Sequence, residues 1–298
     1  MTRLLDLFGP ELAALQGESL RDAIHGSEGR VVMAEAIAPA PPLLTGTSNA
    51  ELVAAFGADL ICLNMFDPGA PGPLFAGLES VVPAPASLSE LARLLGRPVG
   101  LNLEPDLTSV PAGYRASDSV IAAAATQGAA FVVVTANPGR GAAIADLARS
   151  VERVRAVAPQ TLCFAGKMHR AASDEPIDAG SVAPLIEAGA RGVLVPLPGT
   201  VPGIDEAAAR AMTAAAQSAG ALAIGTIGTS QEGADHSTLR SLGLAAKRIG
   251  VDVHHIGDAG YTGLAVPENI YAYSLAVRGR RHTWNRMARG TRASWEES

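Results

Sequence analysis

The stretch ALAIGTIGTSQEGADHSTLRSLGLAAKRIGVDVHHIGDAGYTGLAVPENI, from Ala221 to Ile270, decides the fold. It contains two short apolar runs, and each run leads through a glycine-rich loop into a helical segment. The loops lie at 228–230 and 257–260. Glycine-rich loops that lead into helices expose backbone amides and can bind a phosphate or a carboxylate. Two such units in succession near the C-terminus are typical of the last two units of a (β/α)8 barrel.

In the rest of the chain, short apolar runs recur at intervals of roughly thirty residues, which is about the length of one unit of such a barrel. The eight runs begin near Val31, Asp59, Pro98, Ala130, Thr161, Gly192, Ala221 and Val251. A doubly wound open sheet is the alternative, but no G-x-G-x-x-G follows the first run. We therefore predict a single α/β domain over 1–298, a (β/α)8 TIM barrel with an N-terminal helical extension (1–28) and a C-terminal tail (279–298).

The composition suits this architecture. The chain is 48% hydrophobic but only 4% aromatic, so Ala, Val, Leu and Ile must build the core, as in parallel strands covered by Ala-rich helices. A net charge of −6 argues against binding to nucleic acid or to an anionic membrane surface. No secretion signal or membrane-spanning run is recognisable, which predicts a cytoplasmic protein. Cys62 and Cys163 lie in apolar runs and are expected to be core thiols.

Active sites of such barrels lie at the C-terminal ends of the strands, so polar residues there are candidates for function. In VGLNLEP, alternation places Asn102 and Glu104 on one face and the two leucines on the other. Because helices cover the outside, we expect the polar pair to face the lumen. The other candidates at strand ends are Glu35, Asn64, Asp67, Asn137, Lys167, His169, Thr200, His254, His255 and Asp258.

Lys167 is the leading catalytic candidate. It is one of only two lysines among 23 lysines and arginines, and Cys163 and Ala165 on the same face leave room beside it. Lysine can act as a base, form an imine or contact a phosphate. The alternative is a structural ion pair with Glu35 or Glu104.

The two adjacent histidines of the last run, His254 and His255, point to opposite faces of a strand, so at most one is expected to line the site. The sequence does not decide which one does. We treat both as candidates for substrate binding.

The motifs RPVGLNLEP, FVVVTANPG, PLPGTVPG, AIGTIGTSQEGAD and HHIGDAGYTGLAVPENIYAYSLAVRGRRHTWNRMA resemble a bacterial TIM-barrel family. Its members are often encoded near phosphotransferase-type sugar uptake systems and carry phosphonomutase-like labels. More distantly, the chain resembles the BtpA/SgcQ barrel group. The resemblance implies the barrel fold, a place in carbohydrate metabolism and a site built from the residues at the barrel mouth.

The leading hypothesis is a lyase, isomerase or aldolase-type enzyme that acts on a small phosphorylated or carboxylated compound. Lys167 would polarise a carbonyl or form an imine, and Glu35, Glu104, Asp258 or His169 would transfer protons. The expected substrate-binding residues are Asn64, Asn102, Asn137, Thr200, Gly228, Thr229, Ser230, His254, His255, Gly257 and Gly260.

Two other hypotheses remain open. In the first, Glu35, Asp67, Glu104 and Asp258 hold Mg²⁺ in a phosphonomutase-like lyase or hydrolase, although no cofactor is required by the sequence. In the second, the barrel is a non-catalytic binding or assembly protein. The basic, tryptophan-containing tail fits either a homo-oligomer interface or packing against its own barrel.

Overall fold

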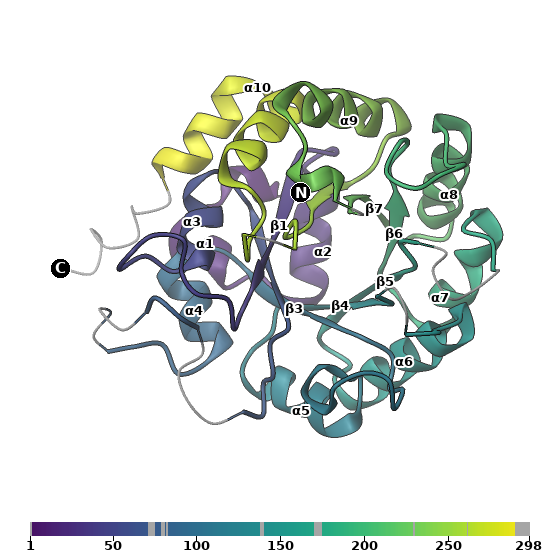
Figure 1. The fold of residues 1–298 in the computed structure, drawn as a ribbon, viewed down its shortest axis with the longest axis horizontal. Coiled ribbons are helices and arrows are strands. Elements are labelled where there is room, and N and C mark those ends of the chain that lie inside the picture. Colours follow the sequence, from purple (N-terminus) through teal and green to yellow (C-terminus); the bar gives the residue numbers. More distant parts are fainter. Residues whose placement is uncertain are drawn as a thin grey trace.

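The computed structural model describes residues 2–70, 75–78, 81, 83–137, 140–169, 175–228, 230–260 and 262–289. Eight parallel strands close into a barrel in sequence order, and the last pairs with the first through Val31 and Val253. The strands are β1 (Val31–Ile37), β2 (Leu60–Asn64), β3 (Val99–Leu103), β4 (Phe131–Thr135), β5 (Leu162–Gly166), β6 (Gly192–Pro196), β7 (Leu222–Ile227) and β8 (Val253–Ile256). The predicted (β/α)8 barrel is confirmed (Figure 1).

Helices surround the barrel (Figure 1). The α-helices of the ring are α3 (Asn49–Ala55), α4 (Leu88–Leu95), α5 (Asp118–Thr126), α6 (Ile144–Val157), α7 (Ala183–Ala188), α8 (Glu206–Ser218), α9 (His236–Ile249) and α10 (Pro267–Ala288). Short 3-10 turns are η2 (Ala112–Tyr114), η3 (Ala179–Ser181) and η4 (Gln231–Gly233). Side chains cap several helices at their starts; at α9, for example, the carboxylate of Asp235 accepts from the amides of Ser237 and Thr238.

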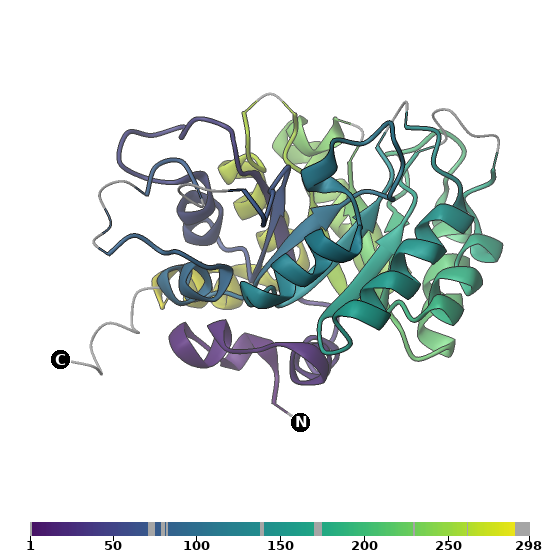
Figure 2. The same cartoon turned by 90° about the horizontal axis from the view of Figure 1, so that it is seen from below.

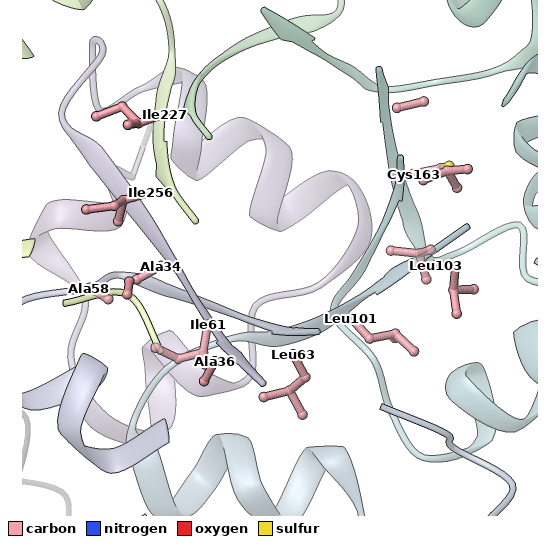
Figure 3. Packing of buried hydrophobic residues seen from close by; sticks show 14 of the residues in the cluster. Ala34, Ala36, Ala58, Ile61, Leu63, Leu101, Leu103, Cys163, Ile227 and Ile256 are labelled. Atoms are coloured by element: carbon pink, nitrogen blue, oxygen red, sulfur yellow. The ribbon is translucent and has the colours of Figure 1, made fainter. Parts of the chain in front are cut away.

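Two apolar layers hold the barrel together. The layer between strands and helices contains Leu101, Leu103 and Cys163, and Figure 3 shows part of it. The layer inside the barrel contains Phe131 and Phe164, whose rings stack 5.7 Å apart. Both cysteines are buried free thiols, as the sequence predicts. Side chains thus fill the lumen below the mouth.

The N-terminal segment covers one end of the barrel. It consists of η1 (Leu4–Asp6), α1 (Gly9–Ala13) and α2 (Gly17–His25), which lie below the strands in Figure 2. Its apolar side chains, such as Leu12 and Ile24, belong to the same cluster as residues at the starts of the strands. The extension therefore seals the end of the barrel opposite the mouth.

The described part of the C-terminal tail packs against its own barrel. Gly279, with φ of +70°, interrupts α10 and forms a kink between its two halves. Arg286 on the second half is buried and donates to Asp59 and to the carbonyls of Leu4 and Leu7. Residues 290–298 lie outside the described residues.

A buried cluster of charges forms around Asp59, which is fully enclosed at the start of β2. Its carboxylate accepts from the amide of Val32 and from the guanidinium groups of Arg278 and Arg286. Arg97 completes the cluster by donating to the carbonyls of Ala58, Gly96 and Arg286. The cluster joins the second strand, the N-terminal extension and α10.

Candidate active site

A polar cavity of about 180 Å³ lies at the carboxyl ends of the strands. Side chains from the ends of the strands and from the loops that follow them line it. They are Glu35, Asn64, Asn102, Thr135, Ala136, Asn137, Met168, His169, Leu194, Thr226, Ile227, Gly228, Glu232, His255, Gly257 and Asp258. The cavity brings together many of the residues that the sequence predicts.

A chain of hydrogen bonds crosses one wall of the cavity. Thr135 Oγ1 donates to Asn102 Oδ1 (3.2 Å), and Asn102 Nδ2 donates to Asn64 Oδ1 (3.3 Å). Asn64 Nδ2 in turn donates to Asp258 Oδ2 (2.8 Å). The backbone amide of Met65 also donates to Asn64 Oδ1, and because an amide N–H can only donate, it fixes the orientation of this side chain. Every bond points towards Asp258, so the chain favours its ionised carboxylate.

His255 and Glu35 form a pair beside this chain. They come from neighbouring strands, and His255 Nε2 lies 3.1 Å from Glu35 Oε1. The contact lacks hydrogen-bond alignment, and neither ring nitrogen of His255 has a hydrogen-bond partner among the described residues. His255 is only 3% exposed. A small rotation of either side chain would allow a proton to pass between them.

Two further carboxyl groups of the cavity have raised pKa values. Burial is the largest effect on the pKa of Glu232 and raises it; the charges of Glu35 and Asp258 add to this, and a hydrogen bond from its own backbone amide opposes it only in part. Burial, followed by the charge of Glu35, raises the pKa of Asp258, and the hydrogen bonds from Asn64 and Gly260 oppose this only in part. Both groups therefore hold a proton more readily than an exposed carboxyl does.

His169 also lines the cavity, as expected for a candidate in proton transfer. Burial is the largest effect on its pKa and lowers it. Neither ring nitrogen has hydrogen-bond geometry to a partner within the described ranges. The imidazole can therefore meet a ligand as a neutral donor or acceptor.

Lys167 does not line the cavity. Cys163, Ala165 and Lys167 share the helix-facing side of β5 and its extension, whereas Phe164 and Met168 lie on the inner side. The buried ammonium donates to the carbonyl of Ala142 (3.1 Å) and lies 3.5 Å from Glu175 Oε2. The expectation that Lys167 faces the lumen is wrong, because the larger Phe164 fills the interior. The alternative was correct in expecting an ion pair, but wrong in the partner, which is Glu175 and not Glu35 or Glu104.

Of the two histidines on β8, His254 faces away from the cavity. Its Nε2 lies 2.9 Å from the carbonyl of Gly29, and its Nδ1 lies 3.2 Å from the hydroxyl of Tyr273 on α10. Burial lowers the pKa of His254 to about 4, so the ring is neutral at physiological pH. The structure thus resolves the ambiguity in favour of His255.

Glu104, Asp67 and Thr200 also lie outside the cavity lining. Glu104 is buried, and its carboxylate accepts from the amide of Asn137 (3.4 Å) and lies 3.5 Å from Arg140 Nε. Asp67 accepts from the amide of Gly69. Thr200 is buried and donates to the carbonyl of Leu197.

Each of the two glycine-rich loops places one of its predicted glycines, Gly228 and Gly257, in the cavity lining. The amide of Gly257 donates to the carbonyl of Ile227, and that of Gly260 donates to Asp258 Oδ1. These amides are therefore engaged within the protein. Gly228 lines the cavity, Ser230 is exposed with φ of +77°, and Thr229 lies outside the described residues.

The sequence did not single out Glu232, Thr135 or Thr226 as site residues, although all three line the cavity. Glu232 lies on η4, beyond the end of β7. In the sequence, the one feature that marks Glu232 is its negative charge just before a helix. That helix already has a capping residue, Asp235, so Glu232 is not needed as a cap.

The expected magnesium ligands do not gather in one place. Glu35 and Asp258 line the cavity, whereas Asp67 and Glu104 do not. Within the ranges that the structure describes, no group of three or more His, Cys, Asp or Glu side chains is arranged to hold a metal ion. No helix in those ranges is long and apolar enough to cross a membrane.

A closed parallel barrel with a polar cavity at the carboxyl ends of its strands places the protein in the (β/α)8 class. Within that class, residues 5–293 match the family described as Domain of unknown function (DUF7916), and the chain belongs to it. No curated protein matches the chain.

Solved structures share the fold. A Burkholderia cenocepacia protein provisionally described as a lyase/mutase is 18% identical, with 82% of this chain and 81% of that chain covered and a TM-score of 0.50. For thiamine phosphate pyrophosphorylase from Pyrococcus furiosus the identity is 12%, the coverage 87% and 97%, and the TM-score 0.46. At these identities the likeness concerns the fold alone.

Proposed function

We propose that the protein is an enzyme that moves a proton to or from carbon in a small polar substrate, as an isomerase or a lyase. One observation carries the proposal: a single cavity holds the His255–Glu35 pair beside two carboxyl groups with raised pKa values. Neighbouring groups of different acidity supply the acid and the base that such a reaction needs.

The residues divide into two roles. Glu35 or His255 takes the proton from a carbon next to a carbonyl group, and the electron pair of the broken C–H bond forms a carbon–carbon double bond. Asp258, in its protonated form, gives a proton to the carbonyl oxygen. For an isomerisation, a proton then returns to the former carbonyl carbon, while the hydroxyl group on the deprotonated carbon loses its proton and becomes the new carbonyl. For an elimination, the enol loses its O–H proton, the carbonyl re-forms, and a leaving group departs with its bonding electrons from the carbon beyond the deprotonated one.

This proposal keeps the reaction class expected from the sequence but moves its centre from Lys167 to Glu35 and His255. The reason is that the ammonium of Lys167 is bound to Ala142 and Glu175 on the other side of β5. The resemblance to barrels encoded near sugar uptake systems supports a small hydroxylated substrate. A magnesium-dependent reaction would retain only Glu35 and Asp258 of the four expected ligands.

The test is exchange of carbon-bound hydrogen in D2O, followed by NMR, because exchange reports proton abstraction even without net turnover. The substrates are hydroxyacetone, dihydroxyacetone phosphate and aminoacetone, which are respectively neutral, anionic and cationic. Glu35→Gln and His255→Asn should each slow exchange by about 10²–10⁴-fold. Glu206→Gln, the same chemical change on the exposed face of α8, serves as the control. Equal rates in all variants, or exchange with none of the three compounds, would contradict the proposal and favour a binding protein.

A further inference from the structure

The cavity is acidic. Three carboxyl groups line it, those of Glu35, Glu232 and Asp258, and no lysine or arginine lines it within the described ranges. Two cations of the described strand-end loops have other partners: Arg140 lies beside Glu104, and Lys167 lies beside Glu175. Among the residues that the structure describes, an anion in the cavity would therefore face three carboxyl groups and no lysine or arginine of the lining.

Buried polar atoms of the cavity also lack partners. Glu232 is only 7% exposed, yet its Oε2 makes no hydrogen bond within the part of the chain that the structure describes. Both ring nitrogens of the buried His255 are in the same situation. Buried polar groups are nearly always hydrogen-bonded, so these atoms indicate that a polar ligand completes the site. An ionised carboxylate only accepts, and Glu232 Oε2 therefore requires a donor from that ligand.

Two amides of the second expected phosphate-binding loop already have acceptors within the protein. The amides of Gly257 and Gly260 already donate to Ile227 and Asp258, and Asp235 caps the start of α9. The carboxyl group of Asp258 itself stands in the loop after β8. That loop is where many barrels of this class bind phosphate.

We propose that the cavity binds a substrate through a protonated amino group. This inference rests on the proposed function and names the substrate class of the same site. An ammonium group has three N–H donors and stays protonated at neutral pH. It matches the acceptors Glu35 and Glu232, while hydroxyl groups of the same compound meet Asn102 and Thr135.

The size of the cavity limits the compound. A volume of about 180 Å³ corresponds to roughly six water molecules at ~30 Å³ each. A compound of about six non-hydrogen atoms therefore fits. 3-Amino-1,2-propanediol has this size, and glycerol and glycerol 3-phosphate differ from it only at one carbon, where a hydroxyl or a phosphate replaces the amine.

The experiment is isothermal titration calorimetry of the full chain with these three compounds at pH 7.5. We expect the amine to bind at least about tenfold more tightly than glycerol, which corresponds to one carboxylate–ammonium contact. Glycerol 3-phosphate should bind most weakly. Glu232→Gln keeps the shape of the side chain and removes its charge, so it should abolish most of the preference for the amine. Glu206→Gln should retain that preference.

Several results would overturn the inference. They are equal affinity for the three compounds, tighter binding of glycerol 3-phosphate, or no detectable binding of the amine. Titration with MgCl2 tests whether the carboxylates bind a metal ion instead. They do so if Mg²⁺ binds, binds more weakly to Glu232→Gln and displaces the amine. Binding of the amine without hydrogen exchange would contradict the proposed function alone. Exchange without a preference for the amine would contradict this inference alone.

Discussion

Replacement of Asp59 by Asn is the sharpest test of how the chain is held together. Asn keeps the shape of the side chain but removes the charge that pairs with Arg278 and Arg286. All three side chains are almost completely buried. Breaking a buried ion pair by removing one partner costs about 3–5 kcal/mol, because the other charge stays enclosed. Against a typical total stability of about 5–15 kcal/mol, this loss is large.

The assay is urea unfolding followed by far-UV circular dichroism, in which a lower midpoint at an unchanged slope reports lost stability. Asp6→Asn is the matched control, because the Asp6–Arg3 pair is exposed to solvent and should matter little. Our reasoning about the cluster is refuted if Asp59→Asn moves the midpoint no further than Asp6→Asn does.

Acid should reveal the same cluster. Burial raises the pKa of Asp59, but the charges of Arg278 and Arg286 outweigh it, so the net shift is downward. A carboxyl group with a lowered pKa stabilises the folded state above its ordinary pKa, and this contribution is lost as the pH falls below about 4. The Asp59→Asn variant lacks the group, so its stability should depend less on pH in that range.

Two other predictions concern Lys167, which the sequence marked for catalysis, and His254, which it marked for substrate binding. Lys167→Met leaves the carbonyl of Ala142 without its donor. We expect the free energy of unfolding in urea to fall by about 1–3 kcal/mol, while the exchange of carbon-bound hydrogen in the substrate continues. Loss of this exchange at an unchanged unfolding midpoint would restore a catalytic role for Lys167. The pKa of His254 is about 4 in the folded protein and about 6.5 in the unfolded chain, so the unfolded state binds more protons between these values. Wild-type stability should therefore fall from pH 6.5 to pH 4 more steeply than that of His254→Gln, and parallel unfolding curves would contradict this.

The barrel itself could be predicted because each strand of a closed parallel sheet is buried on both faces. Such strands appear as short continuous apolar runs, and the predicted starts at Pro98 and Ala130 lie one residue before β3 and β4. Which side of β3 points into the barrel could also be predicted. Asn102 lies between two leucines, and as a polar residue it fits at the mouth of the barrel but not against the helices.

The facing of β5 could not be predicted in the same way. Alternation shows that a strand has two faces but does not say which one lies inside, and both faces of β5 are apolar up to Gly166. Phe164 occupies the lumen against Phe131, and a side chain at Gly166 would come within 2.6 Å of Leu194. These tertiary contacts set the orientation and turn Lys167 towards the helices. Glu232 was missed for a related reason, since the path of a loop depends on packing rather than on periodicity.

The cluster around Asp59 also has a consequence for how the protein is made. A ribosome delivers Asp59 more than two hundred residues before Arg278 and Arg286, which lie 219 and 227 positions further along the chain. Until they emerge, this carboxylate can be enclosed only without its guanidinium partners, and an enclosed charge without a partner is costly. The start of β2 must therefore stay exposed to solvent during most of translation. The final barrel closure is thereby tied to the arrival of its last helix.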